Sequence, residues 1–131
     1  MSDLHAVIDR MGSGWLGDAA AMDDLLADGV VMEVPFAPGG PRKWVGRDEW
    51  LAFAVPARAN FPVRFDRFTK LAVHETVDPE VAVVEYELAG EIAGTGERGS
   101  ARFIGVLRVR EGRIVEWREY QDTYAIQQAL G

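Results

Sequence analysis

Carboxylates at three places in the sequence have the surroundings that proton transfer requires. Asp122 ends the segment RIVEWREYQD, Glu85 and Glu87 stand two residues apart in VVEYELAG, and Glu33 lies between apolar residues in VVMEVPF. A general base needs a carboxylate that little water reaches, because burial raises the pKa of such a group toward neutrality. We expect Asp122 to be the base and Glu33 or Glu87 to be the partner acid, kept protonated by burial. Tyr120 is then a candidate donor to a developing oxyanion.

A structural role is the alternative for each of these carboxylates. Asp122 could cap the following segment TYAIQQAL through its backbone amides. Glu33 could simply face solvent.

Glu85 and Glu87 share one face of their strand, because residues of equal parity point the same way. That face is either the cavity side or the solvent side, and the residues of the other parity are apolar: Val84, Tyr86 and Leu88. If the glutamates face the cavity, the apolar stripe is exposed and is best buried by a second copy of the chain. We then expect a homodimer formed through a surface that consists of Val84, Tyr86, Leu88, Ile104 and Val106.

Composition excludes several classes of protein. The chain has 131 residues with 48% hydrophobic content, which predicts one domain over residues 1–131 with a single core. A net charge of −7 argues against nucleic acid binding, and the lack of cysteine with only two histidines argues against a metal site of nitrogen and sulfur ligands. No apolar run approaches the roughly 18 residues that a membrane span requires. We expect a cytoplasmic protein without metal or cofactor.

The apolar period is helical in the first third of the chain and strand-like afterwards. Ser2 and Asp3 are expected to cap the first helix, Gly12 and Gly14 to end it, and Asp48 to cap the third. This order of helices before strands, without alternation, predicts the α+β class. We expect helices at about 4–11, 15–26 and from 48 to Pro56 or Asn60, a loop at 37–41, and strands at 30–36, 64–74, 81–93, 101–110 and 113–122.

The order of these elements resembles that of the nuclear transport factor 2-like superfamily. The passages GDAAAMDDLLADGVVMEVPF, WVGRDEWLAF and VLRVREGRIVEWREYQD are similar to those of ketosteroid isomerases, limonene epoxide hydrolases and SnoaL-like polyketide cyclases. The resemblance implies a cone: a curved antiparallel sheet with three N-terminal helices packed on its concave face. Such a cone encloses a ligand cavity.

Individual residues separate these relatives. The base and an oxyanion-binding acid of ketosteroid isomerases fall on Val34 and Gly105, which argues against steroid isomerisation. The relay of limonene epoxide hydrolases would place carboxylates at Asp122, Glu85 and Glu87, but its bridging arginine is missing. The SnoaL-like cyclases need an acid/base Asp near the end of the last strand, and Asp122 followed by TYAIQQALG resembles that ending.

The sequence therefore predicts a cofactor-independent acid/base enzyme of the cyclase or isomerase type, acting on a small apolar or polycyclic molecule. An epoxide hydrolase with rearranged acidic residues and a dimeric binding protein without turnover are the alternatives. The residues expected to line the ligand site are Trp15, Val34, Phe36, Trp50, Phe53, Glu85, Phe103 and Gly105.

Overall fold

A mixed, curved sheet organises the molecule. The computed structural model describes residues 2–130, and the side chains of all of these except Ser2, Asp3 and Ala19. The strands are β1 (Leu26–Val34), β2 (Arg42–Val45), β3 (Val63–Glu75), β4 (Val81–Ile92), β5 (Arg98–Arg110) and β6 (Arg113–Gln121). They form one six-stranded sheet in the order β2-β1-β6-β5-β4-β3. Neighbouring strands are antiparallel except β1 and β6, which run parallel.

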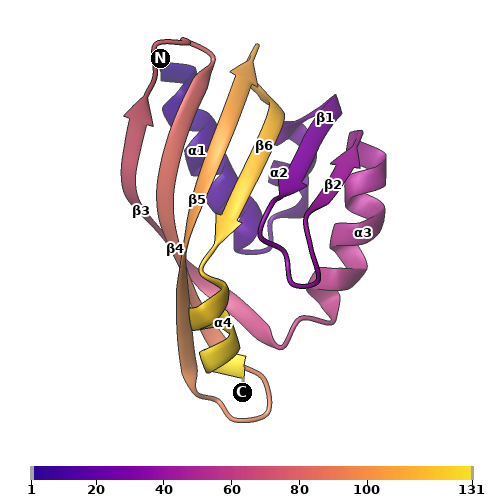
Figure 1. Ribbon diagram of the computed structural model, residues 1–131, viewed down its shortest axis with the longest axis vertical. Coiled ribbons are helices and arrows are strands. Elements are labelled where there is room, and N and C mark those ends of the chain that lie inside the picture. The colour runs from indigo at the N-terminus through magenta and orange to yellow at the C-terminus, as the bar shows by residue number, and fades with distance from the viewer. Residues whose placement is uncertain (1, 131) are drawn as a thin grey trace.

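Helices cover one face of this sheet, as Figure 1 shows. The helices are α1 (Ser2–Trp15), α2 (Ala19–Leu25), α3 (Arg47–Ala59) and α4 (Thr123–Leu130). Helices α1 and α2 lie behind the sheet, α3 lies beside β2, and α4 follows β6 at the foot of the molecule (Figure 1). The predicted α+β fold with a curved sheet is confirmed, and α4 adds a helix at the C-terminal end.

The core lies between α1 and the helix-covered face of the sheet. Residues of α1 at a spacing of three to four are buried: Leu4, Val7, Ile8 and Met11. Alternate residues of β4 meet them from the sheet: Ala82, Val84, Tyr86 and Leu88. Apolar residues at a spacing of three to four lie on one side of a helix, and alternate residues lie on one side of a strand. The two sets therefore bury one continuous apolar layer between α1 and β4.

The burial of β4 corrects the prediction for its two glutamates. Val84, Tyr86 and Leu88 fill the core, so Glu85 and Glu87 lie on the opposite face, which we call the outer face of the sheet. The alternative in which Glu85 and Glu87 face solvent is therefore the one that the structure adopts. The surface predicted for dimer formation is divided in the same way, because only its residues Ile104 and Val106 lie on the outer face.

Two glycines that were expected to end the first helix instead lie within it. A Cβ atom on Gly12 would stand 2.6 Å from the Phe68 ring of β3, and one on Gly14 would stand 2.6 Å from the Met22 side chain of α2. The glycines thus let β3 and α2 approach α1 closely, and the helix continues to Trp15.

Helix ends and one strand also differ from the sequence predictions. Helix α2 begins after Asp18, whose carboxylate accepts a hydrogen bond from the Ala21 amide at 3.0 Å. The N-cap of α3 is Gly46 with φ of 98°, so Asp48 lies in the first turn rather than at the cap. The proposed capping by Ser2 and Asp3 falls outside the described side chains. Strand β2 was not predicted, because its four residues RKWV are too few to show a period.

Along the described part of the chain, no helix combines the length and the apolar character that crossing a membrane would take.

Candidate functional site

A buried carboxylate lies on the helix-covered face of β6. Glu119 is 7% exposed and is the only charged side chain among the described residues that is buried. The Tyr86 hydroxyl donates a hydrogen bond to Glu119 Oε1, and Gln121 Nε2 donates one to Glu119 Oε2 at 2.9 Å. Each carboxylate oxygen keeps a second lone pair, so Glu119 can still accept a proton.

Burial changes the proton affinity of both members of this pair. Desolvation raises the pKa of Glu119, and the hydrogen bonds from Tyr86 and Gln121 act in the opposite direction. Desolvation and the neighbouring Glu119 carboxylate raise the pKa of Tyr86 far above its ordinary value, so Tyr86 stays a neutral donor. A carboxylate whose pKa moves toward neutrality is suited to general acid/base chemistry.

Aromatic rings surround the Glu119–Tyr86 pair. The Tyr86 ring stacks on Phe103 at 5.4 Å between centroids and on Phe68 at 5.2 Å. The Trp15 ring stacks on Phe103 at 6.2 Å and meets Trp117 edge to face at 6.3 Å. Apolar walls with a few convergent polar groups are typical of sites for small organic ligands.

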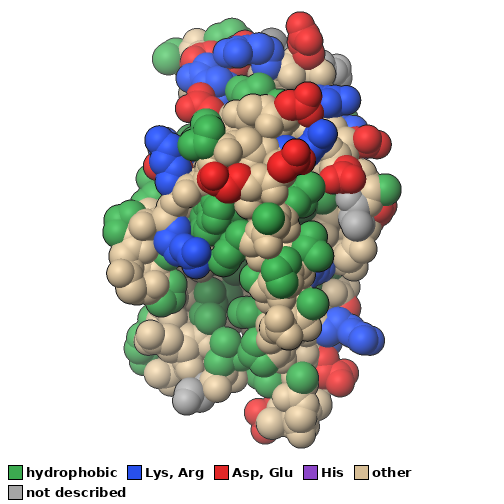
Figure 2. All heavy atoms as spheres, turned by 90° about the vertical axis from the view of Figure 1, so that its right-hand side faces the viewer, with side chains coloured by type: hydrophobic (Ala, Val, Ile, Leu, Met, Phe, Trp, Pro, Cys, Tyr) green, Lys and Arg blue, Asp and Glu red, His purple; other side chains and the backbone are tan. Residues whose placement is uncertain are grey.

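Figure 2 shows the molecule from the side on which α3 and β2 lie in Figure 1. A hollow lined by hydrophobic side chains opens on this face, and acidic and basic side chains gather above it. The hollow suits an apolar ligand.

Local sequence explains how these side chains are positioned. Trp117, Glu119 and Gln121 alternate along β6 and therefore share a face. Side chains pack closely over Gly105 on the neighbouring β5, since a Cβ atom there would be in van der Waals contact with Trp117 Nε1 and Tyr86 Cε1, 3.6 Å from each.

Trp15 stands at the end of α1, where Arg58 of α3 holds the backbone. The Arg58 guanidinium donates to the carbonyl oxygen of Gly14 at 3.0 Å and to that of Trp15. These are carbonyls of the last turn of α1, which have no partner within the helix, and a cation is favoured at that end of a helix dipole. Arg58 therefore fixes the place from which the Trp15 ring enters the interior.

The prediction that Asp122 faces the cavity is wrong. Asp122 is exposed, and its Oδ1 accepts a hydrogen bond from the Ala125 amide at 3.0 Å. Its side chain thus caps the first turn of α4, which is the structural alternative drawn from the sequence.

The other predicted acid/base residues lie on the outer face of the sheet. Glu85 Oε2 lies 2.6 Å from His74 Nε2, at hydrogen-bond distance. Glu87 Oε2 forms an ion pair with Arg102 Nε at 3.7 Å. The Tyr120 hydroxyl accepts from Arg118 Nε at 2.9 Å. None of these side chains reaches Glu119, because the sheet separates them.

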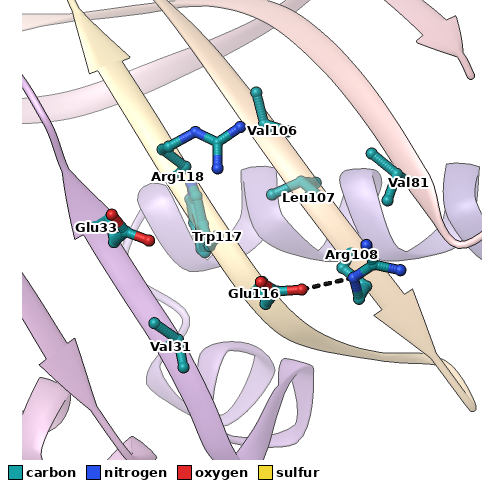
Figure 3. Close-up of a pocket in the computed structure, with 9 residues that line it drawn as sticks. All are labelled: Val31, Glu33, Val81, Val106, Leu107, Arg108, Glu116, Trp117 and Arg118. Carbon is teal, nitrogen blue, oxygen red and sulfur yellow. Dashed lines mark hydrogen bonds and ion pairs between the residues drawn. The ribbon is translucent and has the colours of Figure 1, made fainter.

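Glu33 lines a depression of about 110 Å³ on this outer face, together with Arg118 and an ion pair between Arg108 and Glu116 (Figure 3). Figure 3 shows that these side chains stand on the side of the sheet away from the helices. Phe36 packs against Tyr120 at 5.2 Å between centroids and is mostly exposed.

The predicted ligand-lining residues are divided among three places. Trp15, Phe103 and Gly105 lie around the Glu119–Tyr86 pair. Trp50 and Phe53 of α3 instead form a second aromatic cluster with Trp44, with centroids 4.6 to 5.8 Å apart. Val34 packs against the core, whereas Phe36 and Glu85 lie outside it.

Sequence reasoning missed Glu119 and Tyr86. The sequence did contain a signal for Glu119. It is two residues from Trp117 on the same strand, so both side chains point to the same face, and a large aromatic ring favours the core. The pattern in RIVEWREYQD thus favoured Glu119 over Asp122. Along the described part of the chain, no three His, Asp or Glu side chains converge as metal ligands would.

The fold and the site together define a class: an α+β protein of the nuclear transport factor 2-like fold, with a buried, hydrogen-bonded glutamate and tyrosine in an aromatic interior. Residues 5–117 match the model of the SnoaL-like domain, and the chain belongs to this family. The matched region stops before Glu119 and Asp122, so family membership by itself gives neither residue a role.

Known proteins similar to this chain come from several bacteria. A PhzA/B-like protein of Pseudomonas aeruginosa, itself uncharacterised, is 33% identical over 116 residues, which cover 88% of this chain and 80% of that protein. An isomerase candidate from Bacillus subtilis has a TM-score of 0.86 at 23% identity, covering 99% of this chain and 94% of that one. IdmH, a polyketide cyclase candidate from Streptomyces antibioticus, has a TM-score of 0.73 at 23% identity, covering 97% of each chain.

Proposed function

We propose that this protein is a cofactor-independent acid/base enzyme of the cyclase or isomerase type, which acts on a small apolar ketone. The observation that carries the proposal is the buried pair of Glu119 and Tyr86 inside an aromatic interior. Membership of the SnoaL-like family and the likeness in fold to a polyketide cyclase candidate support the same class of reaction.

In the proposed reaction, Glu119 acts as the base. Its carboxylate removes a proton from the carbon next to the ketone, and the electron pair of the broken C–H bond forms an enolate. If a C=C bond adjoins the α-carbon, protonated Glu119 returns the proton to the far carbon of the resulting dienolate, which is isomerisation. If the enolate carbon instead attacks a second carbonyl carbon of the same molecule, a C–C bond closes the ring, the C=O π pair moves to oxygen, and protonated Glu119 returns its proton to that alkoxide. Tyr86 holds the carboxylate in place through its hydrogen bond.

The epoxide hydrolase alternative receives no support from the arrangement of the carboxylates. Its relay needs acidic groups around one water molecule, but Glu85 and Glu87 lie on the opposite face of the sheet from Glu119. Asp122 is occupied as the cap of α4.

Exchange of α-protons tests the proposal with a simple ketone. 2-Tetralone, a bicyclic ketone, is incubated with the protein in deuterated buffer, and loss of its α-proton signal is followed by NMR. We expect the protein to accelerate exchange over buffer, and Glu119→Gln to reduce this acceleration by about 10²–10⁴-fold, as is typical for loss of a general base.

Asp122→Asn is the matched control, because it removes another carboxylate near the same strand end and should leave exchange unchanged. Equal exchange by the parent protein and Glu119→Gln would contradict the role of Glu119. Binding of 2-tetralone without any accelerated exchange would favour the non-catalytic binding protein instead.

A further inference from the structure

Two buried donors beside Glu119 make no hydrogen bond of good geometry, although the Trp15 indole lies near enough to the Tyr86 hydroxyl to oppose the rise in the pKa of Tyr86. Among the described side chains, the indole nitrogens of Trp15 and Trp117 are the buried polar atoms that make no hydrogen bond. Trp117 as a whole is 3% exposed. A buried donor without a partner is costly, so native proteins seldom leave such a group unsatisfied unless a ligand or an ordered water completes it.

Both indoles lie at the Glu119–Tyr86 pair. Their rings are 6.3 Å apart and nearly perpendicular, with an interplanar angle of 81°. Trp117 Nε1 and the Tyr86 ring edge both pack over Gly105, each 3.6 Å from the position that a Cβ atom would take there. The two donors therefore belong to the same interior as the buried carboxylate.

We infer that the indole N–H groups of Trp15 and Trp117 bind the acceptor oxygen of the ligand, and that this oxygen is a carbonyl. This inference rests on the proposed function, for which it names the groups that hold the substrate oxygen. An indole N–H donates and never accepts, so its partner must be an acceptor. The neighbouring Glu119 carboxylate disfavours a partner that already carries a negative charge, which leaves a neutral oxygen.

The spacing suits a ketone. Trp117 and Glu119 are two residues apart on β6, which separates their Cα atoms by about 7 Å at the usual rise of a strand. A carbonyl oxygen and its α-carbon can bridge groups at this separation when each is contacted at hydrogen-bond distance.

The chemistry favours enolate formation over epoxide opening. Negative charge develops on the carbonyl oxygen when the α-proton leaves, and fixed N–H donors stabilise that charge where water is scarce. An opened epoxide would instead need a proton, which an indole cannot supply at neutral pH. The two tryptophans thus select a substrate whose oxygen becomes charged without being protonated.

Indole NMR signals test the inference directly. The protein contains four tryptophans, so a ¹⁵N-labelled sample gives four indole N–H resonances, each assigned by its loss in the corresponding Trp→Phe variant. We expect 2-tetralone to shift the Trp15 and Trp117 signals in the direction of a new hydrogen bond. Tetralin, the same bicycle without the carbonyl, should not produce that shift.

Affinity provides a second readout. Trp117→Phe should weaken 2-tetralone binding about tenfold relative to tetralin, whereas Trp50→Phe, in the separate cluster on α3, should change neither. If Trp117→Phe does not fold, the Trp117 resonance is assigned as the one that remains after the other three variants have identified theirs, so the shift measured on the parent protein still decides.

The outcomes separate this inference from the proposed function. Shifted indole signals in the Glu119→Gln protein, which has lost exchange activity, would support the oxygen site independently of catalysis. Accelerated exchange with unshifted Trp15 and Trp117 signals would overturn the oxygen site and leave Glu119 as the base. Equal shifts with tetralin and 2-tetralone would also overturn it, because they would show ring contact without a hydrogen bond.

Discussion

Glu119 carries an ionisable group into an interior that is otherwise apolar and aromatic. Burial raises the pKa of this carboxyl, so the folded protein resists its ionisation while the unfolded chain does not. The hydrogen bonds from Tyr86 and Gln121 offset this effect only in part. The same residue is therefore the proposed base and a source of instability at neutral pH.

The sign of this effect predicts how stability changes with pH. The raised pKa of Glu119 means that its contribution to stability is fully present below about pH 4.3, the ordinary value for Glu, and is lost as pH rises from there through the folded pKa. Glu119→Gln has no group to ionise, so its melting temperature should rise relative to that of the parent over this interval and then stay at a constant offset. Melting curves of both proteins between pH 4 and 9 measure this.

An offset that is the same at every pH would show that Glu119 ionises equally in both states, which contradicts a buried carboxyl. The rate of α-proton exchange should increase over the same interval in which stability falls, because the charged form of Glu119 is the active base.

Asp122 stabilises the start of helix α4 by capping its first turn. Asp122→Ala removes the bond to the Ala125 amide and should lower the free energy of unfolding by about 0.5–2 kcal/mol, whereas Asp122→Asn keeps a good N-cap and should cost far less. Chemical denaturation of the two variants measures the difference. Both should keep the exchange activity of the parent, and loss of activity in a folded Asp122→Asn protein would return Asp122 to the catalytic site.

Gly90 allows strands β3 and β4 to lie close together. A Cβ atom on Gly90 in β4 would stand 2.1 Å from the carbonyl oxygen of Arg64 in β3, and that backbone oxygen cannot move aside easily. Gly90→Ala should therefore destabilise the fold by about 1–3 kcal/mol, the usual cost of overpacking. Gly29→Ala is the control, since no atom lies within 4 Å of a Cβ atom there. Similar unfolding curves for the two variants would argue against a tight contact of β3 with β4.

At the scale of the whole molecule, the outer face of the central strands β4 and β5 carries exposed apolar surface. Ile104 on β5 is 42% exposed, and Val106 follows it on the same face with Val83 as its partner on β4. Exposed apolar residues that adjoin one another mark interaction surfaces, and a second copy of the chain is the occupant that we propose for this face. Ion pairs such as that of Glu87 with Arg102 border the apolar residues, as in the polar rim of an interface.

Dimer formation through this face is testable by light scattering at micromolar concentration. We expect the parent to be a dimer and Ile104→Glu to be a folded monomer, because a charge at the centre of the apolar surface opposes its burial. Val77→Glu adds the same charge at a fully exposed turn and should remain dimeric. A monomeric parent would contradict the proposal.

The amino-acid sequence determined most of the helices and strands and the class of fold. Helical spacing in α1, alternation in the long strands and the Pro/Gly loop at 37–41 are local patterns, so they could be seen without any packing partner. The resemblance to the nuclear transport factor 2-like superfamily added the curved sheet with helices packed against it.

Only the tertiary structure decided which face of each strand is the interior. Alternation along a strand defines two faces but does not say which face is covered. A shift of one residue along the strand exchanges the interior set for the exterior set. On β4, packing against the apolar residues of α1 places Tyr86 on the interior face. On β6, Trp117 is buried, and Glu119 lies on the same interior face. Asp122, at the next strand end, was left to cap α4. The carboxylate that meets the aromatic interior is therefore fixed by contacts between residues far apart in the chain, which no local pattern contains.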